Sequence, residues 1–268
     1  MTGATDREWD AGAYHRVSGP QFGWGMRVLE RLELRGDETV LDAGCGTGRL
    51  TAELLRRLPH GQVIALDQSE NMLAEARSRL QPEFGERVRF VRADLGALQL
   101  DREADGIFST ATFHWVLDHS RLFAGLFQAL RPGGWLVAQC GGQGNLDQLR
   151  QRAAALMAQQ PFAPAFQGWS EPWFFADPPA TRDRLRAAGF VDIEVGLEPA
   201  PTPFPSAGEF RMFIETVVLR HHLARLTGAG ADLLAARFLD TLTAHASADT
   251  PPFTLDYHRL NLRARRPG

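Results

Sequence analysis

The segment Thr39–Leu50, with the sequence TVLDAGCGTGRL, constrains this chain more than any other stretch. A short apolar run ends at Asp42 and is typical of a buried parallel strand, and glycine then occupies every second position. Glycine lets the chain turn sharply there and lets a ligand approach the bare backbone. A second apolar run closes on Asp67, 21 residues past Gly46, where a carboxylate can bind both hydroxyls of a ribose. The segment therefore predicts a nucleoside-binding α/β protein.

Strand and helix patterns alternate along the chain, which predicts a doubly wound, mostly parallel sheet with helices on both faces. Seven strands are expected, at residues 39–42, 62–67, 88–92, 104–109, 135–140, 191–195 and 253–265. Seven helices are expected, at residues 49–58, 69–80, 119–130, 146–160, 180–188, 206–226 and 229–246. The sequence therefore predicts a seven-stranded α/β fold with a helical and aromatic cap.

The domain organisation expected from these patterns has four parts. Residues 1–38 form an N-terminal helical lid segment and residues 39–145 form the ligand-binding core. Residues 146–179 form a cap insertion, and residues 180–268 complete the sheet and carry an inserted helical cap at 206–246. The cap insertion holds a bulky Pro/aromatic stretch that suits a lid, because clefts in open sheets lie at the carboxyl ends of strands. The alternative is a loop held on the surface by its rings.

Composition excludes several classes of function. All 29 basic residues are arginine, which excludes a lysine Schiff base, a pyridoxal-phosphate enzyme and a P-loop ATPase. The net charge of −3 and the lack of a basic tract argue against a nucleic-acid partner. Two cysteines and histidines without ligand spacing predict no metal site. With no apolar signal segment and no membrane-spanning run, we expect a cytoplasmic protein, monomeric or homodimeric, without membrane partners.

The spacing of the glycines bears on the ligand. A dinucleotide favours G-x-G-x-x-G, whereas this chain has Gly44-x-Gly46-x-Gly48 with Asp42 just ahead of the turn. An aspartate there repels a pyrophosphate but can face the ammonium end of a methionine. This favours S-adenosylmethionine over a nicotinamide dinucleotide, and a nucleotide dehydrogenase stays as an alternative.

Over roughly residues 39–137 the chain resembles the class I S-adenosylmethionine-dependent methyltransferases, with its motifs in their order. Residues 40–48 and 64–67 resemble the first two motifs, 90–95 the adenine-binding motif, 107–115 the fourth-strand motif and 130–137 the post-motif. The resemblance implies cofactor binding by Asp42, Gly44, Cys45, Gly46, Thr47, Gly48, Asp67, Gln68, Met72, Asp94, Leu95, Thr110 and Ala111.

The resemblance also implies individual roles within that set. The loop glycines approach the methionine end of the cofactor, Asp67 binds the ribose, and the carbonyls of Thr110 and Ala111 face the methionine amine. Asp94 accepts from the adenine amino group, which is a donor only, and Met72 packs on the ring. The plainer alternatives are that Met72 is core and that Asp94 only caps the next turn.

Within that superfamily the chain is similar to the trans-aconitate methyltransferases and their small-molecule relatives. The similarity rests on Trp9-Asp10-x-x-x-Tyr14, on Phe113–His119, and on the paired helices before the final strand. Those relatives carry Gln-Trp where this chain has His114-Trp115. The similarity implies a methyltransferase acting on a small molecule, with O-methylation of a carboxylate favoured over phenol, nitrogen or carbon.

Four residues are candidates for the acceptor side. His114 is the candidate catalytic base for acceptors that need one, because imidazole titrates near neutrality; its alternative is a hydrogen-bonded wall residue. Tyr14 and Trp115 are expected to line the methyl channel, or else to belong to the core. Arg220 is the candidate clamp for a carboxylate, or else a surface arginine. The functional alternatives are a nucleic-acid methyltransferase, which the charge disfavours, and a non-methylating protein that binds the cofactor structurally.

Overall fold

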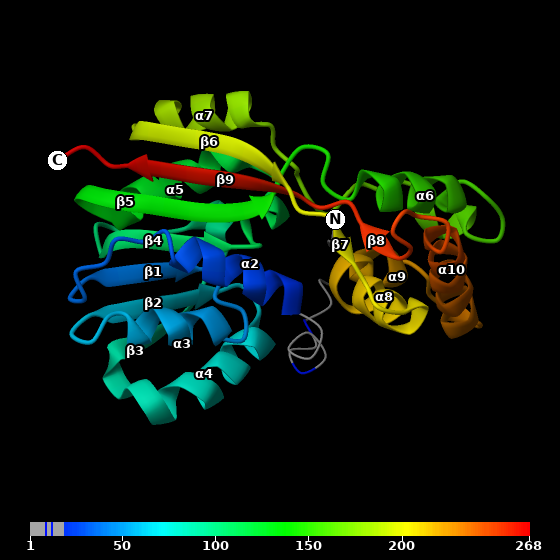
Figure 1. Cartoon of the computed structure of the whole chain (residues 1–268), viewed down its shortest axis with the longest axis horizontal. Coiled ribbons are helices and arrows are strands. Elements are labelled where there is room, and N and C mark those ends of the chain that lie inside the picture. The colour runs from blue at the N-terminus through cyan, green and yellow to red at the C-terminus, as the bar shows by residue number, and fades with distance from the viewer. Residues whose placement is uncertain (1–8, 10–11, 13–18) are drawn as a thin grey trace.

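A seven-stranded sheet forms the larger part of the computed structural model, which describes Trp9, Gly12 and residues 19–268 (Figure 1). The strand order is β3-β2-β1-β4-β5-β9-β6, and β1 to β5 pair in parallel while β9 runs antiparallel to both of its neighbours. The strands are β1 Thr39–Ala43, β2 Gln62–Asp67, β3 Val88–Arg92, β4 Ala104–Thr110, β5 Leu130–Gly141, β6 Val191–Pro199 and β9 His258–Arg265. The predicted mostly parallel seven-stranded sheet is confirmed.

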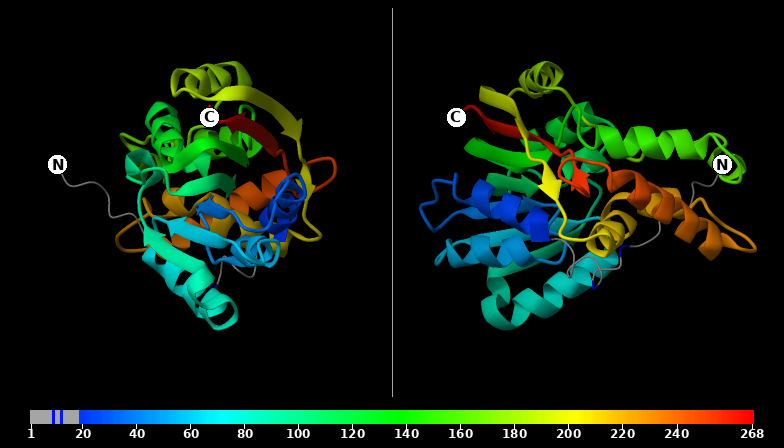
Figure 2. Two further views of the ribbon diagram at one scale, coloured as in Figure 1. Left: turned by 90° about the vertical axis from the view of Figure 1, so that its left-hand side faces the viewer. Right: turned by 45° about the vertical axis from the view of Figure 1, so that its right-hand side comes forward.

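Helices cover both faces of the sheet because alternate strand residues point to opposite sides (Figure 2). In β1, Val40 packs in the cluster that includes Leu54 and Leu80, whereas Leu41 packs in the cluster that includes Leu126 and Leu185. The first face carries α2 Gly19–Leu29, α3 Arg49–Arg56 and α4 Glu70–Phe84. The second face carries α5 His119–Ala129 and α7 Pro178–Ala187.

Helix α4 begins where the sequence places it but ends later. The Ser69 hydroxyl accepts a hydrogen bond from the backbone N–H of Met72 at 3.3 Å, as an N-cap should. The expected end at residue 80 is wrong, because the helix continues through Pro82 to Phe84. Phe84 is buried among the residues of the first face, so tertiary packing extends the helix beyond its propensity.

The cap lies beyond the carboxyl ends of the parallel strands (Figure 1). It consists of α6 Asp147–Met157, α8 Ala207–Phe213, α9 Arg220–Leu223, α10 Ala231–Ala246 and the short pair β7 Thr202–Pro203 and β8 Thr254–Leu255. A separate buried cluster holds it together, in which Phe166 and Trp173 of the Pro/aromatic stretch pack with Phe213 and Phe238. The rings of that stretch therefore belong to the core of the cap.

Two expected elements are divided in the structure. The single helix at 206–226 is wrong: α8 and α9 are separated by a π-helical turn, Ile214–Val218, in which Leu219 donates to the Ile214 carbonyl at 2.7 Å. The single strand at 253–265 is also wrong. Its first part is β8, which pairs with β7 in the cap, and its second part is β9, which pairs within the main sheet. The chain bends between them because it crosses from the cap to the sheet.

The expected N-terminal lid falls mostly on residues whose structure is not described. Helix α2 is described from Gly19, and Trp9 contacts the rest of the molecule, whereas Asp10 and Tyr14 lie outside the described residues. Within the described part of the chain, no helix is long and apolar enough to cross a membrane.

Asp42 is a buried carboxylate at the end of β1. It is 2% exposed and accepts a hydrogen bond from the Thr51 hydroxyl of α3 at 2.7 Å. Burial raises the pKa of Asp42 to about 7, the Thr51 bond opposes that rise, and the nearby Asp67 charge adds to it. The protonated carboxyl is therefore favoured in the folded protein below about pH 7.

We predict that Gly106→Ala destabilises the protein and that Gly196→Ala does not. A Cβ on Gly106 would lie 2.1 Å from the Trp135 ring, whereas no atom lies within 4 Å of a Cβ on Gly196, which also sits in a strand. Overpacking of this kind costs about 1–3 kcal/mol. Urea unfolding of both variants measures the difference, and equal midpoints would contradict the packing of β4 against β5.

A second prediction concerns pH. Because the folded pKa of Asp42 is about 7 and its ordinary value is 3.8, the native state binds more protons than the unfolded state between these values. The free energy of unfolding should therefore fall as pH rises through that window. Asp42→Asn keeps an acceptor for Thr51 and removes the titration. Between pH 4 and pH 8 the free energy of unfolding of the parent should therefore fall by roughly 2–4 kcal/mol more than that of the variant. Parallel stability curves from urea unfolding would refute the assignment.

Candidate functional site

A cavity of about 1220 Å³ lies between the carboxyl ends of the parallel strands and the cap. Its sheet side is formed by the segments that follow β1, β2, β3 and β4, and its cap side by the loop at 168–175 and by α9 with the turn before it. Open α/β sheets bind ligands at this edge. The volume exceeds the ordinary range for one small ligand, so it has room for a cofactor and a second molecule.

The glycine turn after β1 is held against the end of β2. The backbone N–H groups of Gly44 and Cys45 both donate to the Leu66 carbonyl, at 2.8 and 2.9 Å. A Cβ on Gly44 would meet Thr112 Oγ1 at 2.2 Å, so only glycine fits there. No atom lies within 4 Å of the position that a Cβ on Gly46 would take, and Gly46 lines the cavity. Bare backbone is therefore presented to a ligand at Gly46.

Asp67 lies at the end of β2, and backbone N–H groups of the glycine turn and of the segment after β2 orient its carboxylate. Its Oδ2 accepts from the Gly46 N–H and its Oδ1 from the Ser69 N–H, both at 2.9 Å. The carboxylate lines the cavity together with Gln68 and Met72. Two backbone donors thus fix an acceptor group at the cavity edge.

Asp94 follows β3 and combines a structural contact with a place in the cavity. Its Oδ1 accepts from the Gly96 N–H at 2.8 Å, so the expected capping of that turn is present. Asp94 and Leu95 both line the cavity, and the hydrogen bond from Gly96 occupies one of the two carboxylate oxygens of Asp94. Across the cavity edge, Ala111 has φ of 55°, a left-handed conformation that is strained for alanine, and lines the cavity beside Thr110.

The predicted cofactor residues divide into two groups. Those that line the cavity are Gly44, Gly46, Asp67, Gln68, Met72, Asp94, Leu95, Thr110 and Ala111. Four others, Asp42, Cys45, Thr47 and Gly48, do not line it. Asp42 turns to Thr51, Cys45 belongs to the core under α3, and Gly48 precedes the first turn of α3. These four residues belong to the turn and its surroundings but do not face the cavity.

His114 lies on a short 3-10 turn, Phe113–Trp115, and its ring is held by the neighbouring strand. The Gly141 N–H donates to His114 Nδ1 at 3.3 Å. Burial and the Arg259 charge hold the pKa of His114 well below its usual range, so the ring is neutral near pH 7. Since Nδ1 accepts, Nε2 carries the proton of the neutral ring. The arrangement favours the wall alternative over the expected base.

Aromatic rings and a guanidinium form the wall nearest the cap. Trp115 meets Trp9 and Trp173 edge to face, with centroids 5.9 and 5.7 Å apart. Arg220 Cζ lies 3.9 Å from the Trp9 ring centroid and 5.9 Å from that of Trp115. Arg220 is half-buried and lines the cavity, and its role as a carboxylate clamp stays a prediction. Tyr14, the remaining expected acceptor-side residue, lies outside the described residues.

Several cavity residues had no signal in the sequence. Arg259 is 3% exposed, although its position in β9 is typical of a solvent-facing residue, and Asn145 is 2% exposed in the segment after β5. Gln21 of α2 borders the same region. Glu171 of the loop at 168–175 also lines the cavity; its Oε2 is buried without a partner, and burial raises its pKa.

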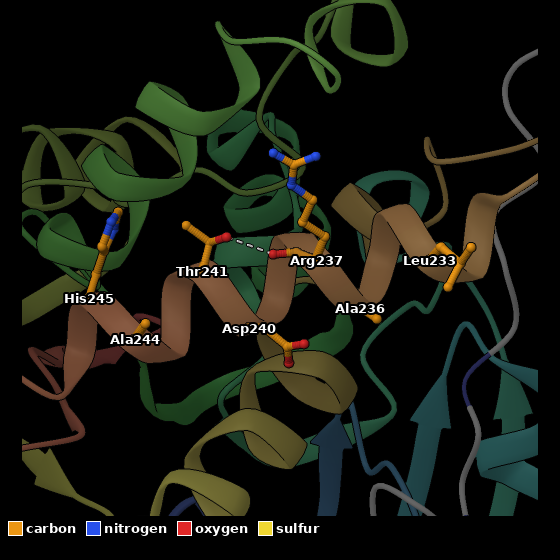
Figure 3. A pocket seen from close by; sticks show the side chains of 7 residues that line it. All are labelled: Leu233, Ala236, Arg237, Asp240, Thr241, Ala244 and His245. Carbon is orange, nitrogen blue, oxygen red and sulfur yellow. Dashed lines mark hydrogen bonds between the residues drawn. The ribbon is translucent and has the colours of Figure 1, made fainter.

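A second, shallower hollow runs along α10 (Figure 3). All of its lining side chains come from that single helix, from Leu233 to His245, and the interaction drawn in Figure 3 is the Thr241 hydroxyl donating to the Arg237 carbonyl within the helix. Across Trp9, Gly12 and residues 19–268, no group of three or more histidine, cysteine or acidic side chains is placed to hold a metal ion. The cavity at the sheet edge is therefore the candidate active site.

Comparison with known proteins agrees with this geometry. A family model described as a methyltransferase domain matches residues 40–134. The trans-aconitate 2-methyltransferase of Deinococcus radiodurans is 31% identical over 252 residues, 91% of this chain and 92% of that protein. The malonyl-[acyl-carrier protein] O-methyltransferase of Xylella fastidiosa is 41% identical over 133 residues, 48% of this chain and 44% of that protein.

A solved structure shows the same fold. Phosphoethanolamine N-methyltransferase 2 of Haemonchus contortus, in complex with S-adenosyl-L-methionine, matches with a TM-score of 0.61 at 21% identity, over 96% of this chain and 57% of that chain. The expected family is confirmed by the long match to the Deinococcus protein together with the methyltransferase domain. This chain belongs to the class I S-adenosylmethionine-dependent methyltransferases, in the group of the trans-aconitate 2-methyltransferases.

Proposed function

We propose that this protein methylates a carboxylate oxygen of a small organic acid. The observation that carries the proposal is the chemistry of the cavity wall, which a neutral His114 with an occupied Nδ1 shares with the guanidinium groups of Arg220 and Arg259. A carboxylate is already ionised near neutral pH, so it needs cations to bind it and no base to activate it.

The residues around the glycine turn fit the cofactor of this family. Asp67 offers acceptors suited to ribose hydroxyls, Asp94 has a carboxylate oxygen beyond the one that caps its turn, and Met72 suits an aromatic face. The open space over Gly46 admits a ligand against bare backbone. S-adenosylmethionine supplies an electrophilic methyl group, and its transfer to a carboxylate gives a methyl ester and S-adenosylhomocysteine with no proton to remove.

The remaining work of the protein is alignment and exclusion of water. Holding two reactants in line is worth roughly 7–11 kcal/mol of the barrier. The rings of Trp115 and Trp173 line the cavity, and Arg220 lies over the indole rings of Trp9 and Trp115. A guanidinium in such a setting binds a carboxylate through two parallel hydrogen bonds. The trans-aconitate and malonyl-[acyl-carrier protein] methyltransferases among the relatives support an acid as the acceptor.

One observation favours a second acceptor class. Glu171 lines the cavity with a buried carboxylate oxygen that has no partner, and burial raises its pKa while the Arg150 charge opposes the rise. A phenol, amine or carbon acid would need a general base. In that case Glu171, rather than the expected His114, is the residue that removes the proton.

The proposal extends to the setting of the enzyme. We propose a free small molecule as the acceptor rather than a nucleic acid, because the net charge is −3 and nucleic-acid binding requires a basic surface. A cytoplasmic location and a monomeric or homodimeric state are part of the same proposal.

Methyl transfer from tritiated S-adenosylmethionine to a panel of small acids, phenols and amines tests the acceptor. We expect label in the acids, trans-aconitate among them, and its release as volatile methanol in alkali because esters hydrolyse there. Arg220→Met should lower kcat/KM for an acid about 10- to 100-fold, and Glu171→Gln should lower it far less. Alkali-stable label that is lost in Glu171→Gln would establish the second acceptor class instead.

Asp67→Ala should weaken the binding of S-adenosylhomocysteine by about 1–3 kcal/mol, because the variant leaves hydrogen-bonding groups of ligand and loop unsatisfied. Isothermal titration calorimetry measures the affinity, and Asp101→Ala, a change at a side chain that is 85% exposed, is the matched control. An affinity equal to that of the control would remove Asp67 from the cofactor site.

A further inference from the structure

We infer that His114, Asn145 and Arg259 form a donor-only floor of the cavity that holds a carboxylate of the acceptor substrate and makes the enzyme prefer acids to amides. The inference rests on the proposed function, which it deepens by naming the residues that recognise the acid. We call these three residues the floor site.

The end of the β5–β9 pair brings the floor site together. Gly141 of β5 lies opposite Arg259 of β9 in the antiparallel register, and Gly142 donates to the His258 carbonyl at 3.0 Å. Directly opposite residues in such a pair have Cα atoms about 4.5–5.5 Å apart. His114 and Asn145 both attach to this strand end through backbone N–H groups, so one local structure positions all three side chains.

The backbone fixes the polarity of His114. The Gly141 N–H donates to Nδ1 at 3.3 Å, and the ring is neutral because burial and the Arg259 charge lower its pKa. A neutral imidazole has one donor and one acceptor nitrogen. With the acceptor used by the strand, Nε2–H is the polar group that remains for a ligand.

The backbone fixes the polarity of Asn145 in the same way. The His258 N–H donates to Asn145 Oδ1 at 3.0 Å, which leaves the Nδ2 amide hydrogens for other partners. A Cβ on Gly141 would lie 2.9 Å from Nδ2, so this amide sits directly over the strand end. Asn145 is 2% exposed and lines the cavity, where its donor end is available.

Arg259 adds charge to the same floor. It is 3% exposed, and its Cζ lies 4.5 Å from the Trp24 ring centroid and 5.9 Å from that of Tyr257. Its backbone lies opposite Gly141, whose N–H donates to His114 Nδ1, and its charge contributes to the low pKa of His114. A guanidinium has five donors and no acceptor, and these ring contacts fix its direction.

The three side chains therefore present donors without acceptors, and two of them are set by backbone contacts that a ligand cannot reverse. A carboxylate, which has only acceptors, matches this set, whereas an amide or amine brings N–H groups that find no acceptor among the three. The neighbouring Gln21 amide has both a donor and an acceptor, so it can serve an acid or an amide and does not contribute to the preference. The floor site is therefore expected to bind an acid more tightly than the corresponding amide.

Calorimetry on the protein loaded with S-adenosylhomocysteine tests the floor site without requiring turnover. The probes are trans-aconitate, malonate and benzoate at up to about ten millimolar, each paired with its amide. We expect at least one acid to bind and its amide to bind at least about tenfold more weakly, the effect of one unsatisfied polar group.

Substitutions of Asn145 and Arg259 test whether these residues bind the acid. Asn145→Asp keeps an acceptor for the His258 N–H but replaces the donor by a charged oxygen, and Arg259→Met removes the guanidinium. Both should weaken binding of the acid about 10- to 100-fold, with S-adenosylhomocysteine affinity within about twofold of the parent. Arg263→Met, the same change at an exposed position of β9, is the matched control and should bind like the parent.

His114 has two readouts of its own. Nitrogen NMR of the loaded protein at pH 7 should show the neutral ring with its proton on Nε2, and a proton on Nδ1 or an imidazolium would overturn the floor site. Glutamine can accept from the Gly141 N–H and donate toward the cavity, whereas leucine can do neither. His114→Leu should therefore lose about tenfold more acid binding than His114→Gln.

The outcomes separate the two proposals. Binding of an acid that is never methylated, with weakened binding in Asn145→Asp and Arg259→Met, supports the floor site and overturns the proposed function. Ester formation with unaltered acid binding in both variants supports the proposed function and overturns the floor site. Failure of every acid to bind overturns the floor site as well.

Discussion

The structure depends first on the contact between the glycine turn and the end of β2. Ala43 and Leu66 lie opposite each other at the ends of two parallel strands, and the Leu66 carbonyl accepts from both Gly44 and Cys45. Asp67 then accepts from the Gly46 N–H, so the same turn is held from two consecutive residues of β2. Strand pairing thereby fixes the distance between bare backbone and carboxylate, the two features on which nucleoside binding depends.

The position of β9 determines how the second half of the cavity is built. Because β9 lies between β5 and β6 and runs antiparallel to both, its first residues lie beside the carboxyl end of β5. The chain reaches β9 from the cap, through β8 and the bend at Asp256 and Tyr257. Cap residues and sheet residues therefore meet at one edge, and Arg259 enters the cavity at the point where the chain joins the sheet.

Local patterns were enough to predict most of the sheet and the residues of the glycine turn. Apolar runs ending in Asp42 and Asp67 marked β1 and β2, because parallel strands are buried on both faces. The strand expected at 253–265 includes Arg259, but nothing in its pattern separates that residue from Asn261 and Arg263 on the same face. That face is open at Arg263 but covered near Arg259, whose guanidinium lies by the rings of Trp24 and Tyr257.

Contacts between different elements also decided the chemistry of two predicted site residues. Asp42 was expected to face a ligand ammonium, but the Thr51 hydroxyl draws its carboxylate away from the cavity. His114 was expected to act as a base, but the Gly141 N–H, 27 residues away, occupies its acceptor nitrogen. The division of the 206–226 helix by a π turn likewise had no local signal, and π turns are rare enough that a helical pattern does not predict one.

The proposed reaction changes the charge within the cavity, and this change relates the contacts of His114, Arg220 and Arg259 to one another. Before transfer the cavity would contain a positive sulfonium together with the guanidinium groups of Arg220 and Arg259, and an anionic acceptor would add to the lining carboxylates that offset this repulsion. After transfer both the sulfonium charge and the acceptor charge are gone. The ester binds these cations less strongly than the acid did, because hydrogen bonds to a charged group are stronger than those to a neutral one. The donors proposed to select the acid would therefore favour release of its ester, and a charged His114 would disturb that balance by adding a further positive charge.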